Sequence, residues 1–480
     1  MKRLTGLCLL LALAGCGRGA PTTDPSMVAE WMQNYYGLIR AERISPPVAS
    51  RLLAYASVAL YEGLATATPS LRSLTGQLNG LDQLPTAEAG LRYDATLVAL
   101  GAERLVLDTL FREGLPTTRA ALATLTDSLV DARTALGIPL DVQERSAALG
   151  RAIGLAIIAW SNSDGFAETR TRPYAPPVGP SLYVNDSRVD EYVSQNLSAM
   201  TELVAIDNPN AQFRSEAAGE RNIVANQPKG AGVTTLKAIN PAGITEPWWG
   251  TIRPFVLRSP DECPLPDHAP FSTDSGSAFW AEADSVYQAG KLLSEEQRQI
   301  TLYWADNPGQ TGTPTGHWLS IGSQMVSERR LSAEAAAELF VMATLAQADA
   351  FIGAWHFKFR DNLIRPNTYI RRYRNPNWAP MIITPTFPEY PSAHSVQSMA
   401  AATVMTRLLG EVAFDDSTNL ALGHQVRRFS SFVDAAIEAA QSRIYGGIHY
   451  PMGRDGGKIQ GACIGEKVLE RLHTRPASTR

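Results

Sequence analysis

The sequence predicts a mostly α-helical protein, in which two helix bundles pack together and long irregular loops cover the end where a site is expected. Leu and Ala are abundant and runs of β-branched residues are scarce, which favours helices over sheets. Apolar residues also recur at helical spacing along most of the chain. They make up 45% of the 480 residues, enough for a substantial core in two or three average domains or one large two-lobed one.

The N-terminal part, residues 26–270, divides into helices followed by loops. From 161 to 270, Pro, Gly and aromatic residues replace the helical period, which is typical of loops that line a pocket. Before that point, Pro and Gly separate segments with helical periodicity. We expect helices at 26–63 (broken at Ser45-Pro46-Pro47), 88–113, 117–136 and 140–160, with a loop at 67–86.

The C-terminal part, residues 271–480, is predicted to be a second bundle without convincing strands. Ser294-Glu295-Glu296-Gln297 forms a capping box at one helix start. The glycine-rich stretch 309–317 lacks the Gly-Lys-Ser/Thr ending of a nucleotide loop, so we expect a turn into the helix that bears Trp318. The expected helices are 277–289, 294–305, 315–327, 332–362, 394–409, 419–443 and 457–472.

The N-terminus is predicted to be a targeting segment. Met1-Lys2-Arg3 is basic, residues 4–14 are apolar, and Leu13-Ala14-Gly15-Cys16 resembles a bacterial lipobox. The apolar run is too short for a membrane-spanning helix. We expect a lipoprotein signal peptide at 1–15, a lipid on Cys16 and a tether at 16–25. The protein would then be exported and anchored to a bacterial membrane on its periplasmic or cell-surface side. A plain secretory signal is the alternative.

Charge and cysteine content limit the expected ligands. The net charge is −4, so there is no basic excess for nucleic acid, and an anion site must be a local cluster. No later stretch offers the roughly 18 uninterrupted apolar residues of a membrane helix. Cys263 and Cys463 remain after processing. Their spacing suits no metal motif, and either a disulfide or two buried thiols is open.

Residues 355–455 contain three short motifs with cationic and imidazole side chains. In the first motif, Lys358 and Arg365 are two helical turns apart and share a face. Pro366 places Arg365 at a helix end. Two cations on one face with no intervening acid repel each other unless an anion lies between them. Taken alone, this motif is equally typical of a solvated basic helix edge.

The second and third motifs add an anion-binding helix start and two histidines. Pro391-Ser392-Ala393-His394 leads into an alanine-rich helix, whose first N–H groups can bind an anion. Arg443 ends a helix and offers a planar donor fork for oxyanions. After two glycines, His449 can coordinate a metal-like centre or attack phosphorus. Together the three motifs predict a site for a tetrahedral oxyanion, phosphate or vanadate.

These motifs resemble the three-part signature of the vanadium haloperoxidase and type-2 phosphatidic acid phosphatase superfamily, and in particular its soluble bacterial haloperoxidase-like branch. The resemblance covers about the last quarter of the chain and implies a helical bundle. It is carried by Lys358-x6-Arg365-Pro366, Pro391-Ser392-x-His394 and Ser442-Arg443-x5-His449.

The resemblance also implies roles for individual residues. His449 would be the axial vanadate ligand, or the nucleophile toward phosphate, and His394 the general acid–base. The oxyanion would be held by Lys358, Arg365, Ser392, Arg443 and the backbone N–H of Ala393.

The chain departs from the signature at two positions. Ala393 stands where Gly is usual, and it cannot easily adopt a φ that Gly might use. Gly453 stands where an acid often follows the last histidine by four residues, so we expect Asp455 to orient His449 instead. By resemblance to the haloperoxidase branch, Asp306 is expected to hold His394.

The aromatic surroundings favour a haloperoxidase over a phosphatase. Trp355 and Phe387 stand where haloperoxidases carry halide-pocket aromatics, although core packing explains them equally well. The first hypothesis is therefore a vanadate enzyme that oxidises halide with hydrogen peroxide. The alternative is a phosphomonoesterase with His449 as nucleophile and His394 as general acid. The third is a catalytically inert phosphate-binding lipoprotein.

Overall fold

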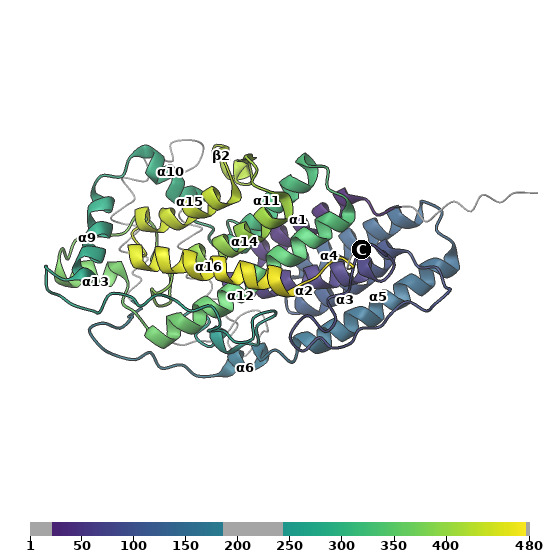
Figure 1. Ribbon diagram of the computed structural model, residues 1–480, viewed down its shortest axis with the longest axis horizontal. Helices are drawn as coiled ribbons and strands as arrows, with labels where there is room; N and C mark the ends of the chain where they lie inside the picture. Colours follow the sequence, from purple (N-terminus) through teal and green to yellow (C-terminus); the bar gives the residue numbers. More distant parts are fainter. Residues whose placement is uncertain (1–21, 186–242, 477–480) are drawn as a thin grey trace, which may run out of the picture.

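Figure 1 shows the computed structural model, which describes residues 22–185 and 243–476. The described residues are mostly α-helical, as the sequence predicts, and their one sheet is a two-stranded hairpin. The predicted signal peptide and Cys16 lie outside the described residues.

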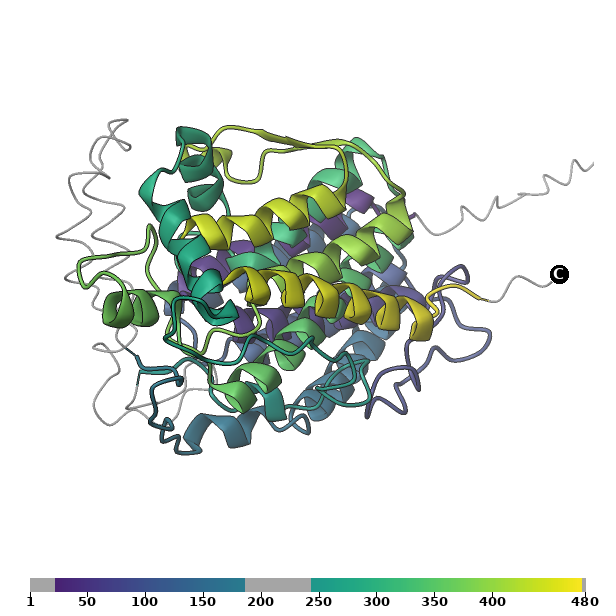
Figure 2. The same ribbon diagram turned by 60° about the vertical axis from the view of Figure 1, so that its left-hand side comes forward.

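Most of the first helices gather at the right-hand end of the molecule in Figure 1, coloured purple to blue, whereas α6 lies apart from that end; in Figure 2 the purple helices lie behind the green and yellow ones. Proline opens three of them, at α1, α2 and α4, where its missing N–H costs no hydrogen bond. α3 packs along both α2 and α5. The bounds are α1 Pro25–Glu42, α2 Pro46–Ala65, α3 Ala95–Leu110, α4 Pro116–Thr134, α5 Leu140–Ser161 and α6 Phe166–Thr171.

The second group of helices is centred on α14, which contacts α12, α15 and α16. α2 packs on α12 and thereby joins the two groups. Gly461 lets α16 approach α14 closely, because a Cβ there would lie 2.2 Å from the Val396 carbonyl oxygen. The bounds are α9 Ala278–Lys291, α10 Glu295–Tyr303, α11 Thr313–Glu328, α12 Ala333–Asp361, α13 Pro366–Tyr373, α14 Ala393–Leu409, α15 Phe432–Tyr445 and α16 Pro451–Arg471.

The longest helix, α12, is a core helix. It is long and apolar enough to cross a membrane by length and composition, but 89% of its most apolar stretch is buried within the protein. The helix packs against α2, α14 and α16. Its C-terminal end carries Trp355 and Lys358, so the core fixes their place.

Several predicted boundaries in the second group are wrong. The helix expected at 419–443 begins only at Phe432, because a hairpin precedes it: β1 (Phe414–Asp416), the 3₁₀ turn η2 (Leu420–Leu422) and β2 (Arg427–Phe429). Phe414 and Phe429 pair in this hairpin and pack into the core, so tertiary contacts override local propensity. The short helix α13 was not predicted, and α16 begins at Pro451 rather than at 457.

The described loops between α6 and α9 are irregular, as predicted, apart from the 3₁₀ turn η1 (Trp249–Thr251). Two of the contacts that fasten them to the bundle involve Asp349 and Cys463. Asp349 accepts hydrogen bonds from the backbone N–H groups of Phe255, Val256 and Leu257. Cys263 and Cys463 form a disulfide, which decides the alternative left open by the sequence. Such bonds are typical of proteins outside the cytoplasm.

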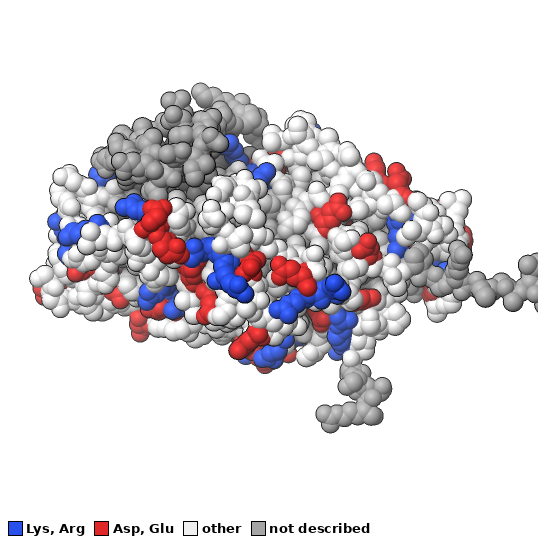
Figure 3. All heavy atoms as spheres, turned by 90° about the horizontal axis from the view of Figure 1, so that it is seen from above, with Lys and Arg blue, Asp and Glu red and all other residues white. Residues whose placement is uncertain are grey.

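Charged residues are mixed on the surface that Figure 3 shows. Lys and Arg side chains alternate there with Asp and Glu, and neither sign forms a dominant patch. On this face or elsewhere, exposed charges of the described residues form ion pairs such as Arg104–Asp127 and Arg407–Glu466. The three motifs predict a local cluster of positive charge, and the face drawn in Figure 3 shows no such cluster.

Candidate active site

The three motifs meet where five helices end. The five polar side chains of the predicted cradle are each no more than 2% exposed. Because every one of them sits at a helix end, the backbone of the bundle sets their positions. Lys358 lies in the last turn of α12, Arg365 is the N-cap of α13, Ser392 is the N-cap of α14, Arg443 lies in the last turn of α15, and His449 precedes α16.

Lys358 joins the first motif to the second. Its ammonium group donates to the carbonyl oxygens of Pro388 and Glu389, each at 2.9 Å, and to that of Pro391. Burial, and then the nearby Arg365, lower the pKa of Lys358 well below its usual value. An anion beside it would counter both effects.

Arg365 joins the first motif to the third. Its Nε donates to the Phe387 carbonyl at 2.9 Å, and its Nη1 donates to the Ile448 carbonyl at 2.7 Å and to His449 Nε2 at 3.1 Å. The buried Nη2 has no hydrogen-bond partner among the described residues. Burial lowers the pKa of Arg365 to about 10. A buried guanidinium with a spare donor is suited to binding an oxyanion.

Arg443 completes the set of cations. It donates from Nε to Ser442 Oγ at 2.9 Å and from Nη2 to the Trp304 carbonyl at 2.6 Å, and burial lowers its pKa to about 10. Among residues 22–185 and 243–476, no ion pair forms with Lys358, Arg365 or Arg443. Glu389 acts electrostatically on Lys358 and Arg365, and Asp306 acts on Arg443, but neither acid forms an ion pair with a cation of the site.

His449 is oriented by Glu389, not by Asp455. Its Nδ1 lies 2.8 Å from Glu389 Oε1, whereas Asp455 pairs with Arg454 at 2.7 Å and with Lys458 at 2.9 Å. The prediction for Asp455 is thus wrong, because its side chain points along the outer face of α16. Burial and the three cations lower the pKa of His449 well below its usual value. The ring is neutral, donates from Nδ1, and keeps its Nε2 lone pair toward the cations.

His394 is held near the Trp304 carbonyl rather than by Asp306. Both Asp306 oxygens contact His317 Nδ1, at 3.0 and 3.2 Å, so the predicted contact of Asp306 with His394 is not formed. Burial, followed by Arg443, lowers the pKa of His394 well below its usual value, and only the Trp304 carbonyl opposes this shift. Its buried Nε2 has no partner among the described residues, and is free to exchange a proton with a ligand.

The start of α14 has the geometry of an anion site. Ser392 is the N-cap, with its hydroxyl 3.4 Å from the Ser395 backbone N–H, and Ala393 is the first helical residue. Ala393 is not among the residues with positive φ. Alanine is therefore accommodated where the signature has Gly, and its N–H stands among the unpaired donors of the helix start.

Comparisons with known proteins identify the family to which the chain belongs. A solved bacterial vanadium-dependent iodoperoxidase superposes with a TM-score of 0.77 at 30% identity, and the match covers 96% of this chain and 100% of that one. The chain belongs to the vanadium haloperoxidase family. The model of the VCPO second helical-bundle domain matches residues 338–476, which include all three motifs.

Two further structures share the fold of this haloperoxidase family member. A holo-type bacterial vanadium-dependent chloroperoxidase gives a TM-score of 0.59 at 16% identity, covering 90% of this chain and 93% of that one. The apo-type structure gives 0.61 at 15% identity, covering 89% and 93%. At such identities the likeness concerns the fold alone. A search of curated proteins finds no match.

The residues of this haloperoxidase-family site fit vanadate, the cofactor that the family implies. Arg365 Nη2 and His394 Nε2 are buried polar atoms without partners in the described parts of the chain. Three buried cations surround a neutral histidine whose Nε2 can serve as a ligand. A tetrahedral oxyanion supplies the negative charge that these cations require and an acceptor atom for Arg365 Nη2.

Phe387 and Trp355 form an aromatic wall beside the cations. Their ring centroids are 4.8 Å apart. Lys358 Nζ lies 5.0 Å from the Phe387 centroid, and Arg365 Cζ lies 4.9 Å from it on the same ring. Trp355 is 1% exposed and donates from its indole to the Thr245 carbonyl at 3.3 Å. Phe387 thus contacts both cations, and Lys358 Nζ also lies 5.8 Å from the Trp355 centroid.

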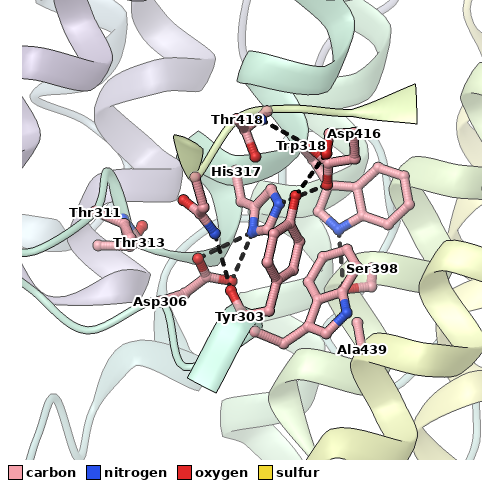
Figure 4. Close-up of polar contacts among 12 residues, drawn as sticks. Tyr303, Asp306, Thr311, Thr313, His317, Trp318, Ser398, Asp416, Thr418 and Ala439 are labelled. Carbon is pink, nitrogen blue, oxygen red and sulfur yellow. Dashed lines mark hydrogen bonds and ion pairs between the residues drawn. The ribbon is translucent and has the colours of Figure 1, made fainter. Parts of the chain in front are cut away.

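A buried histidine between two carboxylates supports the site from behind, and sequence reasoning missed it. Figure 4 shows His317 between Asp306 and Asp416, with Nε2 2.9 Å from Asp416. Burial alone would lower the pKa of His317, but the two carboxylates raise this pKa to about 10. The ring stacks on Trp304 at 4.4 Å, the residue whose carbonyl accepts from Arg443. Asp416 is 99 residues from His317 in sequence, so no local pattern marks the contact.

Proposed function

We propose that the protein is a vanadium-dependent haloperoxidase that oxidises halide with hydrogen peroxide. The observation that carries the proposal is a neutral His449 that is fixed at Nδ1 by Glu389 and accepts at Nε2 from Arg365. Lys358 and Arg443 lie close enough to lower its pKa further, and none of the three cations forms an ion pair within the described residues. Bound vanadate supplies the centre at which hydrogen peroxide is activated toward halide. In this proposal His449 Nε2 is its ligand, and its oxygens are held by Lys358, Arg365, Ser392, Arg443 and the Ala393 N–H.

Each protein group has a definite task in this proposal. The cations withdraw negative charge from the bound oxyanion, and they do so strongly because burial removes screening by water. His394 is neutral and its Nε2 is unpartnered. It can therefore accept a proton from hydrogen peroxide and return it to a departing oxygen.

The aromatic wall supports halide as the second substrate. Phe387 covers one side of both Lys358 and Arg365, so an anion that passes it meets positive charge in a poorly hydrated setting. Large, weakly hydrated halides lose the least on entering such a site. The wall accordingly favours iodide and bromide over chloride.

The phosphomonoesterase remains the second candidate function, because the same His449 could attack phosphorus and the free His394 Nε2 could protonate a leaving alkoxide. One assay separates the candidates. Metal-free protein incubated with orthovanadate is expected to iodinate and brominate a phenol or diketone reporter with hydrogen peroxide. Inertness with every halide, together with hydrolysis of p-nitrophenyl phosphate, would establish the phosphatase instead. Inertness in both assays, with one phosphate bound by calorimetry, would establish a binding protein.

A further inference from the structure

The carboxylate that orients His449 comes from the segment before α14, not from α16. Glu389 is 0% exposed. Its Oε1 lies 2.8 Å from His449 Nδ1 and accepts from the Tyr450 backbone N–H at 2.9 Å. The same oxygen therefore fixes both the ring and the backbone beside it.

The backbone of Glu389 connects this contact to the cations. Its carbonyl accepts from Lys358 Nζ at 2.9 Å, and its N–H donates to the Leu363 carbonyl at 3.0 Å. One residue therefore sets the position of a cation through its main chain and of His449 through its side chain. Displacing Glu389 would disturb the first and third motifs together.

Gly453 leaves the room that the Glu389 carboxylate occupies. A Cβ at Gly453 would lie 2.4 Å from Glu389 Oε1 and 3.0 Å from both Cδ and Oε2. Real Cβ atoms do not approach so closely, and the carboxylate is held by two hydrogen bonds and cannot swing away. Any side chain at 453 would therefore collide with Glu389. Position 453 is also four residues after His449, one turn along the start of α16, where a side chain can reach back toward that histidine.

We propose that Glu389 is the positioning residue for His449, and that Glu389 and Gly453 are a coupled pair in which the orienting acid has moved from α16 to the segment before α14. This inference rests on the proposed function, since it concerns His449 as the ligand of the oxyanion. An acid at either position 389 or position 453 would place its carboxylate beside His449 Nδ1. The two side chains would overlap, so only one of the two positions can hold an acid.

The role of Glu389 is to fix one tautomer and one ring orientation. With Nδ1–H donated to Glu389, the lone pair is on Nε2, the atom that faces Arg365. Without the carboxylate the proton can occupy either nitrogen, and a fraction of the rings would present N–H to the oxyanion. Partners of this kind typically contribute about 10–100-fold to ligand affinity.

Three variants test the coupled pair: Glu389→Ala, Gly453→Asp, and both together. Orthovanadate and inorganic phosphate are titrated by calorimetry, and the His449 tautomer is read from imidazole ¹⁵N shifts. Glu389→Ala is expected to weaken binding of both anions about 10–100-fold and to mix the tautomers. Gly453→Asp alone is expected to lower the melting temperature, because the new side chain meets the Glu389 carboxylate. The double variant is expected to recover most of the affinity, the Nδ1–H tautomer and the melting temperature.

Asp455→Asn is the matched control, since Asp455 lies on the same helix and pairs with Arg454 and Lys458; it should bind both anions as the wild type does. The proposal is overturned if Glu389→Ala binds as tightly as the wild type, or if the double variant is no better than Glu389→Ala. Wild-type protein that binds phosphate but oxidises no halide would refute the proposed function and leave this test intact.

Discussion

Replacing His449 with Ala is expected to abolish halide oxidation by the vanadate-loaded protein. His449 is the proposed ligand of the oxyanion, with its lone pair oriented by Glu389, and the cations that remain can attract an oxyanion but cannot form a bond to it. We expect turnover to fall by at least about 10³-fold, in the range seen when an essential active-site group is removed. The measurement is the initial rate of iodide oxidation at saturating vanadate.

His473→Ala is the control for this experiment, because His473 is exposed and its side chain has no contact with the site. It should leave the rate unchanged. Circular dichroism should show that His449→Ala keeps its helices, because the ring packs at a helix start rather than within a helix. Full turnover by His449→Ala would contradict the assignment of the whole site.

Replacing His317 with Ala is expected to destabilise the fold by about 3–5 kcal/mol, the usual loss when one partner is removed from a buried ion pair. The substitution leaves the carboxylates of Asp306 and Asp416 buried without their shared cation. It also removes the ring on which Trp304 stacks. The measurement is the free energy of unfolding in urea near pH 7.

The pH dependence has a definite sign. The pKa of His317 is raised to about 10 in the folded protein, above the value of about 6.5 expected for an unfolded chain. Its contribution to stability is therefore fully present below about pH 6.5 and is lost as the pH rises through 10. The wild type should lose stability over that window more steeply than His317→Ala. His424→Gln, a change in a neighbouring histidine that packs edge-on against Tyr303, should keep the wild-type profile. Equal slopes for the wild type and His317→Ala would refute the charged cluster.

The oxyanion motifs could be predicted from sequence because each is local. Lys358 and Arg365 are seven residues apart, and Ser392 opens a helix that its own neighbours specify, so spacing and capping rules place these groups at helix ends. That these groups lie close together could not be read from local spacing, because it depends on the packing of α12, α14 and α16 against one another. The resemblance to a known signature supplied the roles.

The partners of the histidines could not be predicted, because they come from distant parts of the chain. Glu389 is 60 residues from His449, and a nearer acid, Asp455, was the natural candidate by sequence distance. The β1–β2 hairpin and α13 were missed for a similar reason. Phe414 and Phe429 pair across a turn and pack on the core, which local periodicity does not reveal.

We propose that the three motifs hold one oxyanion with His449 as its ligand. Diffraction from crystals grown with orthovanadate tests it most directly. We expect a single vanadium peak bonded to His449 Nε2, with oxygens within hydrogen-bond distance of Lys358, Arg365 and Arg443. A vanadium peak elsewhere, or a vanadate that binds in the site without a bond to His449, would contradict it.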